Sequence, residues 1–369
     1  MWNTRLGGRS SACVEGLESR KLFSGGTAAE ASLVAQLSAQ APVQASTVPA
    51  NGDLNPYGVA FVPRHDGVGK LVAGAVLVSN FNASSNLQGT GSTIVQIDPR
   101  TGKQSLFFQG GPGLGLTTAL GFLANGDVIV GNLPADSSGA PAGPGNLLVI
   151  NPNGHLVQTL SDPNLQGPWD LQAMSAGPFS TVFVSNVLSG TVSRLELFAP
   201  SRGSVRVLDD NIIASGYVHR TDPNAFVIGP TGVALNLSTG TLYVASTGDN
   251  AVFSVRNALF RRSSAGTGSV AFSDPHLRGP LGLGFAPNGG LLATNGDAIN
   301  PDPAGLQNSE LVEFTPAGHF VGQFQVDPAA GAAFGFASQE NRDGSFTFAA
   351  VDDGTNQLDL WRVARAPRP

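Results

Sequence analysis

Five histidines are the first residues of this chain to consider for proton-transfer chemistry. A histidine that acts as a general acid or base needs an orienting group close to it. His219 has Asp222 nearby in the segment Tyr-Val-His-Arg-Thr-Asp-Pro, whereas His155 and His319 follow tight Asn-Gly and Ala-Gly turns. His219 is therefore the candidate acid–base or ligand-binding histidine. A solvated loop histidine is the alternative interpretation, and the one we favour.

A second candidate group consists of asparagines that end apolar segments, together with one aspartate. These residues are Asn80, Asn132, Asn186, Asn295 and Asp352. An asparagine at such a point can bond local backbone and tolerate a turn, which is the structural interpretation. The functional interpretation is that these side chains converge to hydrogen-bond a ligand or to hydrate an ion.

Trp169 and Asp170 stand in a Pro-Trp-Asp segment where comparable segments read Pro-x-Gly. The tryptophan either packs between neighbouring units or offers its flat ring as a platform for a sugar or a peptide. Asp170 is the single carboxylate at its position, and a hard cation such as calcium needs several oxygens converging on one point. We therefore predict no resident cofactor and no catalytic residue, with Trp169 and Asp170 as ligand-binding candidates.

Several of these residues belong to a sequence motif that occurs six times along the chain. Its first half is an apolar segment centred on glycine, and its second half is an apolar segment that often ends in asparagine. The central positions are Gly58, Gly121, Asp170, Gly232, Gly282 and Gly335. Self-similarity at a period of roughly 40 to 50 residues, with strand-like segments inside each unit, is typical of a β-propeller.

Each unit continues with a third strand, and five units have a fourth, so one unit corresponds to one four-stranded antiparallel blade. The sixth unit ends at Val363 without an outer strand. Because natural proteins avoid open sheet edges, we expect the segment Pro42–Pro49 to supply that strand and close the ring. The sequence thus predicts an all-β fold, with residues 1–41 as a leader or disordered segment and residues 42–369 as a single six-bladed β-propeller domain.

The segment Gly229–Val255, with Gly-Pro-Thr-Gly-Val-Ala-Leu, Gly-Thr-Leu-Tyr-Val-Ala-Ser and Asn-Ala-Val-Phe-Ser-Val, resembles the NHL repeat. The likeness extends over residues 55–363. It implies membership of the NHL, streptogramin-lyase-like and gluconolactonase-like propellers, which include both enzymes and binding modules. Gluconolactonase-like propellers hold a divalent ion at the channel mouth, so the resemblance leaves room for a channel-bound cation such as calcium.

A shorter resemblance concerns the leader. The segment Cys13–Gly25 is similar to the Leu-Glu-x-Arg-x-Leu-x-Ser motif found near the N-terminus of planctomycete surface and secreted proteins. It implies that the protein is bacterial and exported, so that it is extracellular or attached to the cell surface. The lone cysteine, Cys13, rules out an intramolecular disulfide.

Composition narrows the classes of partner. Charged residues make up 12% of the chain, its formal net charge is −6 and its arginines are scattered, so we expect no nucleic-acid partner. No run of 18 or more apolar residues suggests a membrane-spanning helix. A monomer that binds a small molecule, a glycan or a protein is the expectation.

Loop lengths indicate where such a partner would bind. The longest insertions, at residues 81–91, 133–144 and 296–308, and the long segment 209–229 fall on one rim of the predicted ring. Since binding usually resides in loops displayed by a rigid scaffold, this rim is the predicted binding face. The predicted function is ligand or partner binding without chemistry, and the alternative is a lactonase-like or streptogramin-lyase-like hydrolase or lyase.

Overall fold

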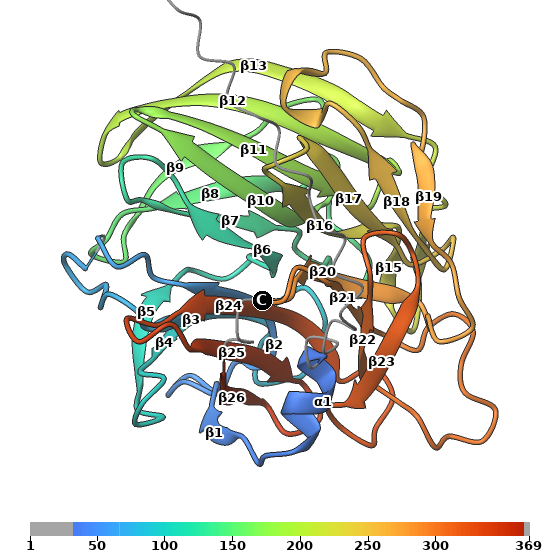
Figure 1. Cartoon of the computed structure of the whole chain (residues 1–369). Helices are drawn as coiled ribbons and strands as arrows, with labels where there is room; N and C mark the ends of the chain where they lie inside the picture. Colours follow the sequence, from blue (N-terminus) through green and yellow to red (C-terminus); the bar gives the residue numbers. More distant parts are fainter. Residues whose placement is uncertain (1–31, 66, 365–369) are drawn as a thin grey trace, which may run out of the picture.

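The computed structural model describes residues 32–65 and 67–364, and it is a ring of six four-stranded antiparallel sheets (Figure 1). The leader motif at Cys13–Gly25 lies outside the described residues. Blade 1 comprises β2 (Leu54–Phe61), β3 (Val76–Asn82), β4 (Thr93–Ile97) and β5 (Gln104–Gln109). Blade 2 comprises β6 (Leu116–Phe122), β7 (Val128–Asn132), β8 (Asn146–Ile150) and β9 (Leu156–Leu160). Blade 3 comprises β10 (Pro168–Ala176), β11 (Phe179–Asn186), β12 (Thr191–Ser201) and β13 (Ser204–Ser215).

The second half of the ring follows the same plan. Blade 4 comprises β16 (Pro230–Asn236), β17 (Thr241–Ser246), β18 (Ala251–Val255) and β19 (Ser269–Phe272), with the 3-10 turn η1 (Ala258–Phe260) before its last strand. Blade 5 comprises β20 (Pro280–Phe285), β21 (Leu291–Asn295), β22 (Glu310–Phe314) and β23 (Phe320–Gln325). Blade 6 comprises β24 (Ala333–Glu340), β25 (Phe346–Asp352), β26 (Gln357–Val363) and, from the other end of the chain, β1 (Val43–Ser46). The predicted fold class is confirmed.

The N-terminal strand closes the ring where the sequence predicts. β1 pairs antiparallel with β26, from Val43 opposite Leu360 to Ser46 opposite Gln357. Ala45 points into the core, whereas Val43 is half exposed. The first and last parts of the chain therefore share one sheet, which removes the open edge of blade 6.

A short helix precedes this strand and was not expected. Helix α1 (Leu33–Ser38) is capped by the Ser32 hydroxyl, which accepts a hydrogen bond from the Ala35 N–H. Its apolar residues Leu33, Val34 and Leu37 are buried in one cluster with side chains of blades 5 and 6. The segment that packs on the propeller thus begins before residue 41, the predicted end of the leader. Within the described ranges no helix is long and apolar enough to cross a membrane.

The innermost strands explain the glycine of the repeat. Each has an irregular register at the repeat centre, and four blades carry glycine there. A Cβ on Gly335 would lie 2.0 Å from the Tyr57 carbonyl oxygen of the next blade, and one on Gly232 would lie 2.4 Å from the Leu283 nitrogen. Where six strands converge, neighbouring backbones approach too closely for a side chain, so glycine is required.

Blade 2 corrects the predicted repeat alignment. Leu116 pairs with Asn132 as Pro56 pairs with Asn80, so the position equivalent to Gly58 is Thr118. Gly121 lies farther along β6 because this strand contains one additional residue within its bulge. The ring of central positions therefore has two adjacent blades without glycine, at Thr118 and Asp170.

Candidate ligand-binding site in the central channel

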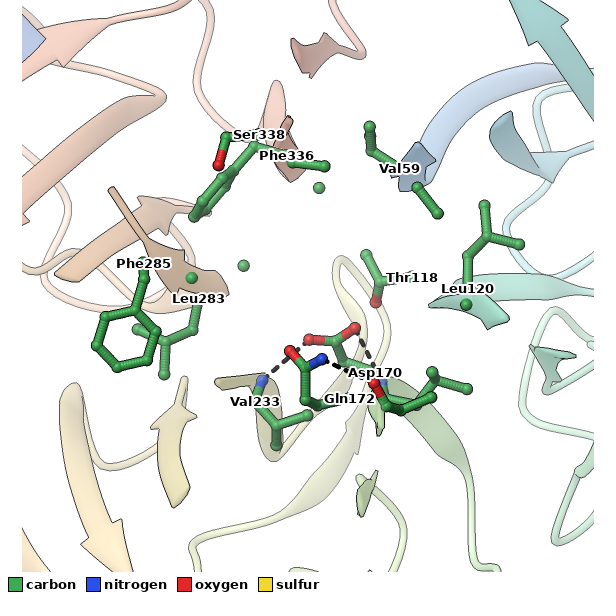
Figure 2. Close-up of a pocket in the computed structure, with 18 of the residues that line it drawn as sticks. Val59, Thr118, Leu120, Asp170, Gln172, Val233, Leu283, Phe285, Phe336 and Ser338 are labelled. Atoms are coloured by element: carbon green, nitrogen blue, oxygen red, sulfur yellow. Dashed lines mark hydrogen bonds between the residues drawn. The ribbon is translucent and has the colours of Figure 1, made fainter. Parts of the chain in front are cut away.

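The channel contains a cavity of about 340 Å³ between the inner strands (Figure 2). Its lining residues come from all six blades, and most lie in the second halves of these strands. That end leads to the connections between first and second strands, which are short turns in five blades and the longer segment 62–75 in blade 1. We call this end the hairpin rim. The opposite rim, called the insertion rim, carries the long loops where binding was predicted.

Most side chains that line the cavity are apolar, three polar side chains share one side of it, and backbone groups make much of its exposed surface polar. Thr118, Asp170 and Gln172 lie on this side, whereas Ser338 lies across the channel beside Phe336. The larger apolar side chains are those of Val59, Leu120, Leu283, Phe285 and Phe336. Thr118 and Asp170 occupy the two central positions that lack glycine, so the polar side of the cavity exists because the repeat departs from glycine there.

The Asp170 carboxylate is held by backbone groups of two blades. One oxygen accepts a 2.9 Å hydrogen bond from the N–H of Val233, and the other accepts one of 2.9 Å from the N–H of Leu171. The Asp170 N–H itself donates to the Ser185 hydroxyl at 3.0 Å. The side chain is thereby fixed at the channel wall without a basic partner.

Burial in this apolar channel raises the pKa of Asp170 to about 7, although the two N–H donors favour the ionised form. Near neutral pH the carboxyl group can therefore accept a hydrogen bond or, when protonated, donate one. The nearby Gln172 amide donates a hydrogen bond to the Ala173 carbonyl oxygen. The Thr118 hydroxyl donates one to the Trp169 carbonyl oxygen. Of the described residues that line the cavity, Asp170 alone is ionisable, so no second side chain there can act as its acid–base partner.

Aromatic rings fill the channel beyond this cavity, toward the insertion rim. Tyr57 stacks between Phe334 and Phe81, with ring centroids 4.0 Å and 4.5 Å away. Trp169 meets Phe81 edge-on at 5.4 Å and is almost fully buried. The tryptophan thus packs between blades in this structure. Its role as an aromatic platform stays a prediction.

Phe226 completes this aromatic cluster from outside the blades. It begins β15 (Phe226–Ile228), which pairs with β14 (Arg220–Asp222) in a hairpin inserted before blade 4. Its ring lies 5.4 Å from Phe81 and 6.5 Å from Trp169. Its backbone has φ of +63°, a left-handed conformation that is unfavourable for a bulky residue. The contacts of the ring therefore hold a strained backbone in place.

The asparagines at the strand ends are buried and bond the protein itself. The side-chain oxygens of Asn132, Asn186 and Asn295 accept hydrogen bonds from the backbone N–H groups of Gly115, Gln166 and Arg278. Their amide nitrogens donate to third-strand side chains, namely those of Asn146, Ser193 and Glu310. Asn80 likewise donates to Thr93 and to the Thr47 carbonyl oxygen. These contacts tie the segment before each inner strand to the blade, and direct ligand contact by these amides stays a prediction.

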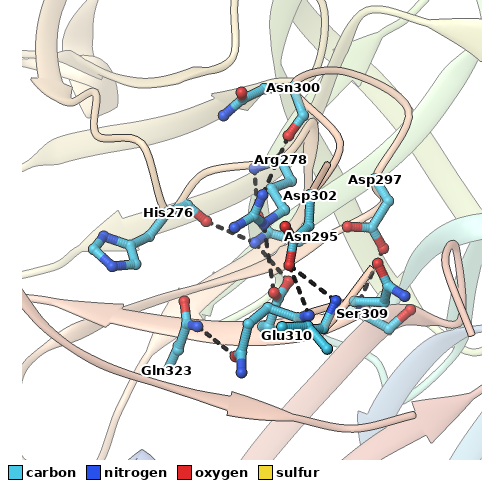
Figure 3. A network of polar contacts seen from close by, with 12 residues as sticks. His276, Arg278, Asn295, Asp297, Asn300, Asp302, Ser309, Glu310 and Gln323 are labelled. Atoms are coloured by element: carbon cyan, nitrogen blue, oxygen red, sulfur yellow. Dashed lines mark hydrogen bonds and ion pairs between the residues drawn. The ribbon is translucent and has the colours of Figure 1, made fainter. Parts of the chain in front are cut away.

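Blade 5 strengthens this arrangement with a buried charge (Figure 3). Glu310 is fully buried, and its carboxylate lies 3.5 Å from the guanidinium of Arg278 while it accepts from Asn295. Asp352, which ends the second strand of blade 6 as Asn295 ends that of blade 5, accepts hydrogen bonds from the N–H and hydroxyl of Thr355. Both carboxylates therefore serve local structure on the insertion rim.

The structure does not bring His219 and Asp222 together. The imidazole Nδ1 of His219 lies 3.0 Å from the Tyr217 carbonyl oxygen, and the side chain is exposed. Asp222 instead accepts from the N–H groups of Asn224 and Ala225. His276, which was not predicted, forms such a pair, since its Nδ1 lies 2.5 Å from the Asp274 carboxylate, and its ring stacks on Phe320 at 3.7 Å. The Asp-Pro-His spacing was the available signal.

A metal centre is not assembled by the part of the chain that the structure describes. There, no three His, Cys, Asp or Glu side chains are grouped so that they could hold an ion. The inner-strand positions that would face the insertion mouth are instead occupied by rings such as Tyr57, Trp169 and Phe334. Among the residues present, the channel carboxylate of Asp170 could offer only a single acidic ligand.

Comparison with known proteins finds similar folds among solved structures. No protein-family model matches the sequence, and no curated protein matches it. A solved structure described as a putative gluconolactonase is similar, with 17% identity, coverage of 88% of this chain and 97% of that chain, and a TM-score of 0.53. A luciferin-regenerating enzyme matches with 11% identity, coverage of 88% and 95%, and a TM-score of 0.52. The calcium-binding protein regucalcin from Agrobacterium tumefaciens matches with 13% identity, the same coverage and a TM-score of 0.51.

The likeness to these structures supports the β-propeller fold that the sequence resemblance implied. At these identities the likeness establishes the fold alone. Function has to be argued from the site, because one scaffold hosts many activities.

Proposed function

We propose that this propeller binds a small organic molecule in the channel cavity at the hairpin rim, without chemical turnover. The observation that carries the proposal is that the described lining of the cavity includes a single ionisable group, Asp170, fixed by two backbone donors. General acid–base catalysis by one unassisted carboxyl group lacks the second group that most such reactions need. Binding needs only a few well-placed polar groups beside apolar side chains, and this cavity has both.

The chemistry of the wall defines the ligand class. Asp170, Gln172 and Thr118 offer hydrogen bonds on one side, while Leu283, Phe336 and their neighbours offer apolar contact on the other. A neutral polyol or a primary amine of roughly monosaccharide size, with one apolar face, fits this division and the volume of about 340 Å³. The predicted export of the protein is part of the same proposal, since it would expose the cavity to extracellular solutes.

The test is a ligand-observed NMR screen of the full chain against monosaccharides, polyols and primary amines. We expect hits whose affinity falls about tenfold or more in Asp170→Asn, through loss of a hydrogen bond to a charged group. Asp136→Asn, which alters an exposed aspartate of the insertion rim, is the matched control and should bind normally. Hits that are indifferent to Asp170→Asn but lost on insertion-loop substitution would refute the channel assignment.

A lactonase-like or lyase-like reaction is the second candidate, and one observation favours it. The pKa of Asp170, raised to about 7 by burial, is suited to proton transfer near neutral pH. Purified protein would then hydrolyse aldonolactones, or open cyclic ester substrates by elimination, and Asp170→Asn would abolish the turnover. Absence of turnover over pH 5 to 9, with ligand binding retained, would leave the binding function alone.

A further inference from the structure

A groove of about 760 Å³ lies on the hairpin rim between blade 6 and blade 1. It forms there because blade 6 is built from both parts of the chain. In the other blades a turn or, in blade 4, the segment 256–268 joins the third strand to the fourth, but β26 and β1 have no such connection. β1 also pairs only with Gln357–Leu360, so the last residues of β26 extend beyond it along the groove.

Arginine is concentrated in this groove. Four of the chain's 20 Lys and Arg residues line it, although the protein as a whole has a formal net charge of −6. They come from four places on the two blades. Arg64 lies between β2 and β3, Arg100 between β4 and β5, Arg342 between β24 and β25, and Arg362 in β26.

Neighbouring carboxylates neutralise only part of this charge. Asp98 lies 3.6 Å from the Arg100 guanidinium, and Asp343 pairs with Arg362. Arg64 donates to the carbonyl oxygen of Glu340. Arg342 is exposed and, within the described residues, makes no ion pair or side-chain hydrogen bond. The described lining residues thus comprise four guanidinium groups and two carboxylates.

We propose that this groove binds an anionic oligosaccharide, through carboxylate or sulfate groups that pair with Arg342, Arg64 and their neighbours. A guanidinium presents paired donors that match a carboxylate or sulfate in a bidentate geometry. The groove has more than twice the volume of the channel cavity. It therefore suits a chain of several sugar units better than a single small anion.

The walls between the arginines fit a sugar chain. Val43 and Val72 are 51% and 58% exposed and give the groove apolar patches against which the C–H faces of sugar rings can pack. Gln339, Asn341 and Thr347 add amide and hydroxyl groups. Gln339 directly follows Ser338 of the channel cavity, so the groove starts beside the channel mouth and runs outward along the blade seam.

An acidic peptide fits the same surface less well. A peptide commonly gains affinity by adding a strand to a free sheet edge. Along β26, β1 occupies the edge over four residues, and beyond it the Gln40 side chain donates to the Arg362 carbonyl oxygen. A peptide also depends on an aromatic or aliphatic anchor held in a deep pocket, and the large ring nearby, Trp361, is buried and fills its own site. The sugar chain is therefore the ligand that we test first.

The experiment is isothermal titration of the full chain with four polymers at low and at physiological salt. The probes are oligogalacturonate for carboxylates, a dextran sulfate oligomer for sulfates, neutral dextran and poly-glutamate. We expect one of the two anionic glycans to bind, with affinity that falls as salt rises, and neutral dextran not to bind. Preference between oligogalacturonate and dextran sulfate identifies the anionic group.

The matched variants are Arg64→Gln/Arg342→Gln in the groove and Arg202→Gln/Arg206→Gln on blade 3, which change the net charge equally. We expect the groove variant to lose about tenfold or more in affinity, because each lost pair is a charge-assisted hydrogen bond. The blade 3 variant should bind like the wild type, and unchanged melting temperatures would show that all variants fold. Asp170→Asn should not alter glycan binding, which separates this site from the channel.

Three results would overturn the proposal. The first is the absence of binding to either anionic glycan at low salt. The second is an equal loss of affinity in both arginine variants, because that would indicate general charge attraction. The third is tighter binding of poly-glutamate than of both glycans, which would assign the groove to acidic peptides.

Discussion

The carboxylate of Asp170 in blade 3 accepts a 2.9 Å hydrogen bond from the backbone N–H of Val233 in blade 4. This contact joins two inner strands at the point where four other blades carry glycine. It also directs the single ionisable group of the described cavity lining toward the channel. The same side chain therefore serves both the closure of the ring and the proposed binding site.

The first prediction concerns the pH dependence of stability. Burial raises the pKa of Asp170 in the folded state to about 7, above the value in an unfolded chain, so the folded state retains the proton longer. Stability contributed by this group is then present at low pH and falls as pH rises from about 4 to about 7. Relative to wild type, Asp170→Asn should gain on the order of 2 kcal/mol of unfolding free energy between pH 5 and pH 8.

Urea denaturation of both proteins at pH 5, 6, 7 and 8 measures this difference. Other buried carboxyl groups with raised pKa, such as that of Asp353, are present in both proteins, so their contributions cancel in the comparison. A constant difference between the two proteins across this pH range would contradict the assignment of the raised pKa to Asp170.

The second prediction tests why the repeat contains glycine. Gly335→Ala would place a Cβ 2.0 Å from the Tyr57 carbonyl oxygen, so adjacent blades would have to separate. Overpacking of this kind typically costs about 1–3 kcal/mol. Gly111→Ala is the control, because a Cβ there meets nothing within 4 Å. Thermal unfolding should show a clear loss for the first variant and little change for the second.

Much of the fold could be predicted because the repeat reports strand periodicity and blade number directly. The glycine pattern predicted the inner strands, yet it misplaced the centre of blade 2 at Gly121 because one additional residue in β6 moves the equivalent position to Thr118. Helix α1 was missed since six residues with three buried side chains give little periodic signal. Short elements of this kind are defined by what they pack against.

The site was harder to predict than the fold. A carboxylate in a glycine position is visible in the sequence, and the structure places Asp170 in the cavity wall, where its role in binding stays a prediction. The position of the cavity near the hairpin rim was not predicted, since the long loops indicated the insertion rim as the binding face. Aromatic rings fill one mouth of the channel, and these rings come from residues far apart in the sequence, such as Tyr57, Phe226 and Phe334. No local pattern reports such packing.

The third prediction concerns ring closure by β1. Ala45 is 4% exposed and packs against blade residues such as Leu358 and Val95, whereas Val43 on the same strand is 51% exposed. Ala45→Asp would bury a charge without a partner and should cost several kcal/mol or prevent folding. Val43→Asp should be nearly neutral. Similar melting temperatures for the two variants would mean that β1 contributes little to closure.

The last prediction concerns Phe226, whose ring fills the insertion end of the channel from a left-handed backbone. Phe226→Ala removes the ring contacts and should cost about 3 kcal/mol or more, as for other buried aromatic side chains. Phe226→Gly removes the same ring but relieves the backbone, because glycine adopts positive φ readily. The glycine variant should therefore be at least as stable as the alanine variant, the reverse of the usual order in a strand. Urea midpoints of the two variants decide the matter, and an alanine variant that is clearly the more stable of the two would show that Phe226 carries no backbone strain.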